Sequence, residues 1–198
     1  MTHPDAKGHI RKLWQADKEA FHAHLLRLDF DSRRRRFAMA ASDAFIERYV
    51  ETCFRLDSVI HGYFEDGELR GVGELRFLDT STTAAEAAFS VETDWQGKGI
   101  GSELMEHTIL TARNRGISRV YMNCLASNRS MQKMARSAGA ELDFEAGEVV
   151  GLVVPPHASV ASVAREAVLD TEGWATAIVD LQRRFVRLPF LKVFGFSA

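Results

Sequence analysis

The residues with the clearest chemical meaning form a glycine-rich turn, Gln96-Gly97-Lys98-Gly99-Ile100-Gly101. An apolar run that predicts a strand, Ala87 to Val91, precedes the turn, and a helical pattern, Ile100 to Arg115, follows it. Glycine lets the backbone approach a ligand closely, and the first N–H groups of a helix lack partners within that helix. Because such a turn is a ready anion site, we expect it to hold a phosphate-bearing ligand.

Two common phosphate-binding motifs do not fit this turn. A P-loop requires Ser or Thr after its Gly-Lys pair, but Gly99 follows Lys98. A dinucleotide fingerprint that began at Gly97 would need glycine where Ser102 stands, and it normally follows the first strand of its unit. The remaining pattern, Gln96-x-x-Gly99-x-Gly101, is also compatible with a tight turn between a strand and a helix in another α/β fold.

The composition predicts a globular protein of one domain with an extension. The chain has 198 residues, 46% of them hydrophobic, and a net charge of −2, so no basic field suggests a nucleic-acid partner. Cys53 and Cys124 show no spacing pattern, as expected of a reduced cytoplasmic protein. No apolar core lies in Met1 to Asp5 and no run has the length of a membrane span, so we expect no membrane association. His22 and His24 do not share a helix face, so no metal site is expected.

The remaining chain predicts an alternation of strands and helices. Strands are expected at residues 9–14, 58–64, 69–77, 84–91, 118–125, 141–144 and 149–154. Helices are expected after the capping residues Asp17 and Ser42, from Ile100, and after Ser127 or Asn128. The pairs Asp66-Gly67 and Ala146-Gly147 predict hairpin turns. The run Arg33 to Arg36 is expected to form a solvated loop or short helix, although it could also be a patch for acidic substrates or nucleic acid.

This order of elements resembles the GNAT superfamily of N-acetyltransferases over residues 9–154, and the Gln96 pattern resembles the acyl-CoA pyrophosphate loop of that family. The helix start Asn128-Arg129-Ser130-Met131 and the strand Ala85 to Phe89 are most similar to the catalytic domains of bacterial protein lysine acetyltransferases. The resemblance implies an α/β (mixed α+β) fold, in which helices flank a central mixed, mostly antiparallel sheet. It implies a GNAT domain at residues 1–156 and leaves residues 157–198 as an extension.

The resemblance also implies a site for acetyl-CoA as cosubstrate, without a metal. The strand of Val91 and the strand of Tyr121 to Leu125 would splay apart and receive the pantetheine arm, and the N–H of Val91 would donate to the thioester carbonyl. Asn128 would contact the pantetheine arm or cap its helix. The implied cofactor-binding residues are Phe89, Val91, Gln96, Gly97, Lys98, Gly99, Ile100, Gly101, Ser102 and Asn128.

The resemblance assigns the catalytic base to Glu86, with Val91 as the other catalytic residue. An amine acceptor must lose a proton before it attacks, and a carboxylate that acts directly or through water can take it. Glu86 could instead be an exposed glutamate on a sheet face, and Glu74 on the preceding strand is the substitute.

One position departs from the family pattern. Many GNAT enzymes place a tyrosine, the general acid for the leaving thiolate, seven residues after the asparagine, where this chain has Ala135. Ser130, Tyr121 and Cys124 are substitute donors, although each is expected to be structural. The departure puts acid catalysis in doubt, but a thiol of pKa about 8.5 is a tolerable leaving group.

The segment after Pro156 predicts two helical stripes, separated at Gly173, and an apolar tail, Phe190 to Phe196. We expect the extension to pack on the core or on a partner subunit, so a homodimer is possible. The sequence thus predicts a cytoplasmic enzyme that transfers acetyl from acetyl-CoA to an amine, with a protein lysine narrowly preferred. The alternatives are a small-molecule amine as acceptor, or a non-catalytic domain that senses acetyl-CoA.

Overall fold

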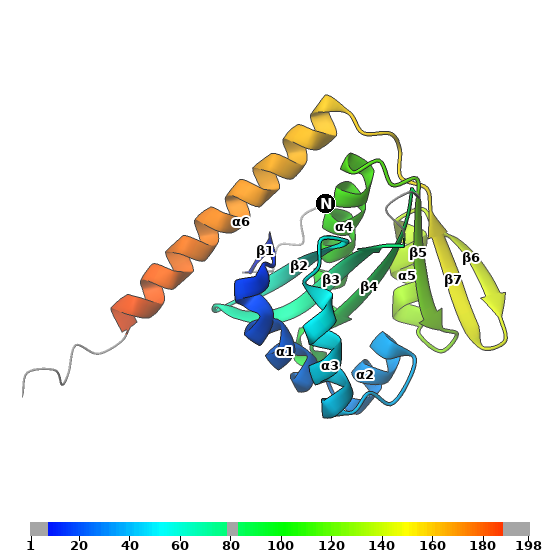
Figure 1. The fold of residues 1–198 in the computed structure, drawn as a ribbon, viewed down its shortest axis with the longest axis horizontal. Coiled ribbons are helices and arrows are strands. Elements are labelled where there is room, and N and C mark those ends of the chain that lie inside the picture. The colour runs from blue at the N-terminus through cyan, green and yellow to red at the C-terminus, as the bar shows by residue number, and fades with distance from the viewer. Residues whose placement is uncertain (1–7, 79–82, 188–198) are drawn as a thin grey trace, which may run out of the picture.

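The computed structural model describes residues 8–78 and 83–187, with the backbone alone for residues 176–187. A sheet of seven strands in the order β1-β2-β3-β4-β5-β7-β6 forms its centre (Figure 1). Every neighbouring pair is antiparallel except β4 and β5, which run parallel, so the expected mixed, mostly antiparallel sheet is confirmed. The strands are β1 (His9–Lys12), β2 (Ser58–Glu65), β3 (Glu68–Phe77), β4 (Ala84–Val91), β5 (Arg119–Leu125), β6 (Glu141–Glu145) and β7 (Glu148–Val153).

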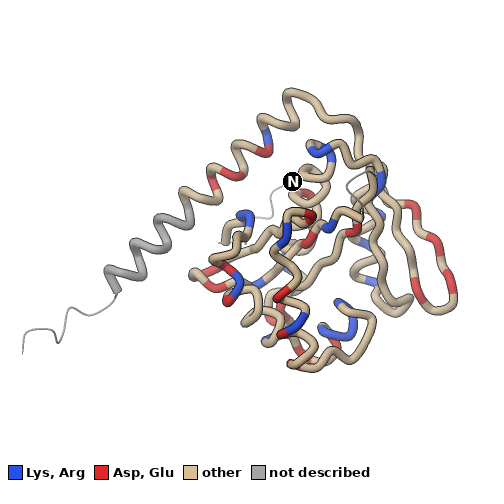
Figure 2. The backbone as a smooth tube through the Cα atoms, in the orientation of Figure 1, with Lys and Arg blue, Asp and Glu red and all other residues tan. Residues whose placement is uncertain are grey.

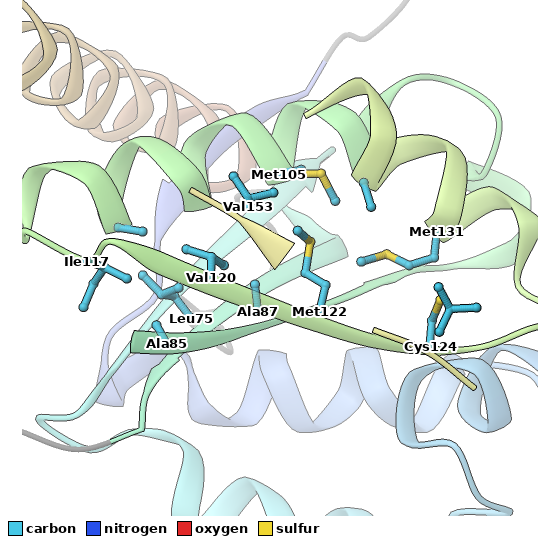
Figure 3. Packing of buried hydrophobic residues seen from close by; sticks show 13 residues of the cluster. Leu75, Ala85, Ala87, Met105, Ile117, Val120, Met122, Cys124, Met131 and Val153 are labelled. Carbon is cyan, nitrogen blue, oxygen red and sulfur yellow. The ribbon is translucent and has the colours of Figure 1, made fainter. Parts of the chain in front are cut away.

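Helices cover both faces of the sheet (Figures 1 and 3). Three lie on one face: α1 (Lys18–Arg27), α2 (Phe30–Phe37) and α3 (Asp43–Cys53). Two lie on the other: α4 (Ile100–Asn114) and α5 (Arg129–Ser137). The sequence predicted two helices before β2 and a loop or short helix at Arg33 to Arg36. α2 is that short helix, and Asp29 caps it by accepting a hydrogen bond from the backbone of Ser32.

Alternate residues of the strands build a separate hydrophobic core on each face. Figure 3 shows the core beneath α4 and α5, where Ala85 and Ala87 of β4 meet Val120 and Met122 of β5 and Met105 of α4. On the opposite face, α1 and α3 pack on β2 and β3 through a second cluster: Phe21, Leu25, Ile46, Val50, Ile60 and Val72. Two glycines of β3 let α4 lie close to the sheet, since a Cβ atom at Gly71 would come within 3.1 Å of the Leu104 side chain and one at Gly73 within 2.8 Å of the Thr108 hydroxyl.

The predicted turns and two of the three predicted N-caps, Ser42 and Asn128, are confirmed. Positive φ angles at Asp66 (51°) and Gly67 (70°) fit the tight turn between β2 and β3. Ser42 accepts a hydrogen bond from the N–H of Phe45 at 3.2 Å and caps α3. Asp17 makes no such cap for α1, because its carboxylate is held by Arg11 at 2.6 Å and by the N–H of Trp14 at 2.9 Å.

A single helix, α6 (Val160–Arg187), replaces the two predicted after residue 157, so the predicted break at Gly173 was wrong. Glycine stands there because a Cβ atom would come within 2.4 Å of the Ile10 carbonyl oxygen. The glycine at position 173 is therefore explained by the close contact of α6 with β1 and not by a turn. Lys12 of β1 pairs with Glu166 at 2.8 Å and with Asp170 at 2.6 Å, which ties the first half of α6 to the core.

The extension, residues 157–198, is described only as far as residue 187. The backbone of α6 runs on past the sheet in Figure 1, and the apolar tail Phe190 to Phe196 lies outside the described residues. The domain boundary at 156 and the homodimer therefore stay predictions. In the described ranges, no helix combines the length and the apolarity that a membrane crossing requires.

Candidate active site

A gap between β4 and β5 forms the centre of the site. The two strands pair only at Ala84↔Arg119, Ala85↔Val120 and Glu86↔Tyr121. Beyond these pairs β5 stays with β7 as far as Leu125, while β4 continues along β3 to Val91. The predicted splaying of the two strands is thus confirmed, and it leaves one edge of β4 without a strand partner after Glu86.

The amides of Phe89 and Val91 face this gap. The N–H of Glu92 donates to the Arg70 carbonyl at 3.0 Å, so Glu92 points its backbone groups toward β3. Because successive residues of a strand point their backbone groups to opposite sides, Ser90 also bonds toward β3, whereas Phe89 and Val91 point away from it. Either N–H can therefore donate to a carbonyl group that lies in the gap, as the sequence predicted for Val91.

A cavity of about 370 Å³ lies at the end of the gap. It is bordered by most of the predicted cofactor-binding residues, namely Phe89, Val91, Gln96, Gly97, Gly99, Gly101, Ser102 and Asn128. Two predicted residues are not among its lining residues. Ile100 is only 1% exposed and belongs to the core, and the ammonium of Lys98 lies over the Trp95 ring at 4.2 Å.

The turn has the conformation that its glycines predict. Gly97 and Gly99 have φ angles of 75° and 87°, which side chains other than glycine rarely adopt. At Gly101, a Cβ atom would come within 2.8 Å of the Met134 sulfur, so this glycine permits close packing of α4 on α5. Gln96 donates to the carbonyl oxygen of Val91 at 2.9 Å and fixes the turn to the end of β4.

Two further observations bear on the ligand of the cavity. Arg35 and Lys133 border it, so cations as well as helix amides are available to phosphate groups. Asn128 borders it too, and its side-chain oxygen accepts a hydrogen bond from the Met131 N–H at 3.1 Å. The capping role that was one of the two predictions for Asn128 is therefore present, while its contact with a pantetheine arm stays a prediction.

The two candidate carboxylates have different surroundings. Glu86 is half-buried and receives a hydrogen bond of 3.3 Å from the side chain of Asn123. It lies along β4 from the cavity and does not border it. Glu74 is buried, is paired with the guanidinium of Arg36, and accepts a hydrogen bond from the Tyr49 hydroxyl at 2.7 Å. The carboxylate of Glu74 is therefore held by a cation and a hydroxyl, whereas that of Glu86 has one weak hydrogen bond.

The arginine run forms the short helix that was one of its two expected structures, and Arg34 and Arg35 are exposed, but its other two arginines are not solvated. Its residues lie in α2, and the side chains of Arg33 and Arg36 are only 16% and 7% exposed. Burial alone would lower the pKa of Arg36, but the charge of Glu74 outweighs it and holds the pKa above its usual value. This buried pair fixes α2 beside the cavity.

The residues that could replace the missing tyrosine differ in whether they border the cavity. Ala135 is buried at 2% exposure and packs toward Gly151 instead of bordering the cavity. Ser130 borders the cavity, and half-buried Tyr121 lies beside Glu86. Burial raises the pKa of Cys124, which disfavours its thiolate. Among the described residues, no group of three His, Cys, Asp or Glu side chains is arranged to hold a metal ion.

Sequence reasoning missed a buried polar chain next to the cavity. Ser90 of β4 hydrogen-bonds to His24 of α1, and His24 hydrogen-bonds to Glu92. The residues lie 66 and 68 positions apart in the sequence, so no local spacing signals the contact. The one signal in the sequence was the position of His24, a polar residue on the face of α1 that is otherwise buried and apolar.

Comparisons with known proteins agree with this geometry. Residues 10–140 match the Acetyltransferase (GNAT) family. The acetyltransferase PA5475 of Pseudomonas aeruginosa is 30% identical over 138 residues, which are 66% of this chain and 73% of that protein. The acetyltransferase Pat of Mycolicibacterium smegmatis is 42% identical over 71 residues, which are 35% of this chain and 21% of that longer protein.

Solved structures give the same assignment. The GNAT domain of S. lividans PAT superposes with a TM-score of 0.67 at 25% identity, covering 74% of this chain and 90% of that domain. An N-acetyltransferase from Staphylococcus aureus superposes with a TM-score of 0.59 at 17% identity, covering 76% of this chain and 99% of that protein. This second similarity supports the fold alone. The chain therefore belongs to the GNAT acetyltransferase family and is an acyl-CoA-dependent N-acetyltransferase.

Proposed function

We propose that this enzyme binds acetyl-CoA in the gap between β4 and β5 and transfers its acetyl group to a lysine side chain of a protein. The observation that carries the proposal is the gap itself, where the amides of Phe89 and Val91 point toward a cavity bordered by the glycine-rich turn. An acyl-CoA fits these features, since its phosphates suit the turn and its extended arm suits an unpaired strand edge. Acetyl-CoA supplies the activated acyl group.

Glu86 acts as the base in this proposal. A lysine amine has a pKa of about 10.4, so its deprotonation at pH 7 costs about 4–5 kcal/mol. Glu86 lies on the same strand as the two gap-facing amides, and Asn123 holds its carboxylate through one weak hydrogen bond. No ion pair compensates Glu86 in the described part of the chain, which leaves its carboxylate available to the acceptor, directly or through water.

An acidic face on the same side of the sheet as Glu86, two to three strands away, supports a protein acceptor. Register places four exposed acidic residues of β6 and β7 on the same face of the sheet as Glu86: Glu141, Asp143, Glu145 and Glu148. Helices α1 to α3 lie over the other strands, and Figure 2 shows acidic residues along the β6–β7 hairpin. We call these four residues the acidic shelf. An open surface of this charge suits a lysine in a basic segment better than it suits a small molecule that must be enclosed.

The first experiment compares Glu86→Gln with wild type in a thiol-release assay with acetyl-CoA and a lysine-rich protein. The variant keeps the shape of the side chain but cannot accept a proton, so we expect kcat to fall roughly 10²–10⁴-fold, with unchanged affinity for acetyl-CoA. Glu74→Gln is the matched control for removal of a carboxylate from the same face, with its folding checked by thermal melting. A rate for Glu86→Gln within threefold of wild type would remove the base from the proposal.

The second experiment tests the acceptor. A protein mixture is set in competition with polyamines, aminoglycosides and amino acids, and the double variant Asp143→Asn with Glu148→Gln is compared with wild type. We expect the variant to raise KM for the protein acceptor about three- to tenfold at low salt, and less at high salt. Glu47→Gln with Glu106→Gln, which removes the same charge outside the acidic shelf, is the control. Turnover of small amines alone would contradict the protein acceptor, and binding of acetyl-CoA without any turnover would indicate a sensing domain.

A further inference from the structure

Ser90, His24 and Glu92 form a hydrogen-bonded chain behind the reactive end of the gap. The Ser90 hydroxyl lies 2.9 Å from Nε2 of His24, and Nδ1 of His24 lies 3.2 Å from the carboxylate of Glu92. Arg27 and Arg70 hold the same carboxylate at 2.8 Å and 2.9 Å. A hydroxyl, an imidazole and a fixed carboxylate in this order resemble the groups that move protons in hydrolases.

The chain of groups opens onto the cavity at one end only. Ser90 borders the cavity and is 8% exposed, while His24 is completely buried. Ser90 directly precedes Val91 and follows Phe89, the two residues whose amides face the gap. Its hydroxyl is therefore the polar end of the chain that a bound thioester or amine can reach.

The hydrogen bonds fix the resting protonation states. Burial tends to raise the pKa of Glu92, but the hydrogen bonds from His24, Arg27 and Arg70 lower it to about 2, so Glu92 is an anion at neutral pH. Burial lowers the pKa of His24, which also faces Arg27 and Glu74, so the imidazole is neutral. Since the anionic Glu92 accepts from Nδ1–H, Nε2 is assigned as the acceptor of the Ser90 hydroxyl proton.

The chemistry of amide formation requires such a group. A lysine enters as an ammonium ion and must lose two protons to become a secondary amide, while the departing CoA thiolate gains one. Glu86 takes the first proton before attack. The family tyrosine that would protonate the thiolate is absent at Ala135. Of the substitutes at the site, Ser130 is exposed and Tyr121 lies beside Glu86, whereas Ser90 is backed by a buried imidazole.

We propose that Ser90, backed by His24 and Glu92, relays the second amine proton to the departing thiolate, a proposal that rests on the acetyl transfer proposed above. After the N–C bond forms, the nitrogen gives its proton to the Ser90 hydroxyl, and the hydroxyl proton passes to Nε2 of His24. As the C–S bond breaks, the imidazolium returns its proton to Ser90, and Ser90 protonates the sulfur. Both residues end in their initial states, and the net change is one proton moved from nitrogen to sulfur.

Ser90→Ala is the direct test, and thermal melting checks its folding because the change leaves the buried Nε2 of His24 without its partner. We expect kcat to fall roughly 10- to 100-fold, with acetyl-CoA affinity unchanged within twofold, since the relay supplies part of the total acid–base effect. The deficit should shrink between pH 7 and pH 9, where the thiolate needs less protonation. Ser90→Thr keeps the hydroxyl and should restore most of the rate, which a merely structural role would not require.

His24→Gln is the second test, with His61→Gln as its control. His61 is as deeply buried (1%) but lies in β2 beside Thr111, away from the cavity. We expect the His24 variant to lose kcat at unchanged acetyl-CoA affinity, and to add little to the loss in Ser90→Ala, because the two residues act as a unit. The control should retain kcat even where thermal stability falls.

The outcomes separate the relay from the proposed function. A kcat of Ser90→Ala within threefold of the wild-type value would overturn the relay but leave the proposed acetyl transfer standing. A fall in kcat that is the same at every pH and is not restored by Ser90→Thr would also overturn it. Wild-type protein that binds acetyl-CoA but releases no CoA with any acceptor would contradict the proposed transfer, and the relay with it.

Discussion

A single charge placed in the glycine-rich turn should separate ligand binding from folding. Gly99 borders the cavity and lies at the N-cap of α4 with a φ angle of 87°. Gly99→Asp and Gly99→Asn impose nearly the same backbone strain and volume at this position, since both residue types tolerate left-handed backbone better than most. The two variants differ mainly in one negative charge, so their comparison isolates electrostatics.

The loss of binding free energy that this charge causes can be calculated from the position of the turn at the cavity. If the new carboxylate lies about 6 Å from the pyrophosphate, each phosphate charge costs about 1 kcal/mol at an effective dielectric constant of about 60, and two cost about 2 kcal/mol. This corresponds to roughly 30-fold weaker binding of acetyl-CoA for Gly99→Asp than for Gly99→Asn. An aspartate at a helix N-cap is favourable in the absence of ligand, so the free Asp variant should be at least as stable as the Asn variant.

Isothermal titration calorimetry with acetyl-CoA at low salt and at about 0.5 M salt provides the assay. Salt screens charges that are accessible to solvent, so the difference between the two variants should shrink at high salt. Thermal melting of the ligand-free variants is the control that tests whether both are folded. Equal affinities of the Asp and Asn variants at low salt would refute the placement of the pyrophosphate at this turn.

Three further predictions concern the framework around the site. Arg36→Met should destabilise the protein by about 3–5 kcal/mol in urea denaturation, because Glu74 is left buried and unpaired, and adding Glu74→Gln should recover part of the loss. Gly173→Leu should release the first half of α6 and speed its cleavage by trypsin, because a Cβ atom there would approach the Ile10 carbonyl to 2.4 Å, whereas exposed Thr171→Leu should not. Burial lowers the pKa of His107 to about 4, so the unfolded chain binds its proton first as pH falls from about 6.5, and stability falls by up to about 3 kcal/mol near pH 4. His107→Gln should flatten this part of the stability curve, and an unchanged pH slope in chemical denaturation would refute the assignment.

Much of the fold was predictable because its signals are local. The strand Ala84 to Val91 was predicted at its observed limits, since an apolar run ends directly before polar residues and glycines. The glycines of the turn and the pair Asp66-Gly67 indicate positive φ angles, which the structure has at Gly97, Gly99 and both turn residues. The capping pattern at Ser42 was likewise sufficient to place the start of a helix.

The parts that were missed depend on contacts between distant segments. Arg36 appeared to belong to a solvated basic run, but Glu74, 38 positions away, pairs with it below the surface. The contact of His24 with Ser90 joins α1 to β4 in the same way. Gly173 resembled a helix break, because the sequence does not show that the backbone of β1 passes against that face of α6. Local patterns predict conformation, whereas these features follow from the packing of one element on another.

The most direct test of acetyl transfer is mass spectrometry of acceptors after incubation with isotopically labelled acetyl-CoA and purified enzyme. Wild type, Glu86→Gln and Gly99→Asp are compared on the same mixture of proteins and small amines. We predict labelled acetyl groups on lysine side chains of basic proteins with wild type, and strongly reduced labelling with both variants. Label in small amines alone would contradict the protein acceptor, and no label in any acceptor above an enzyme-free control would contradict acetyl transfer to an amine.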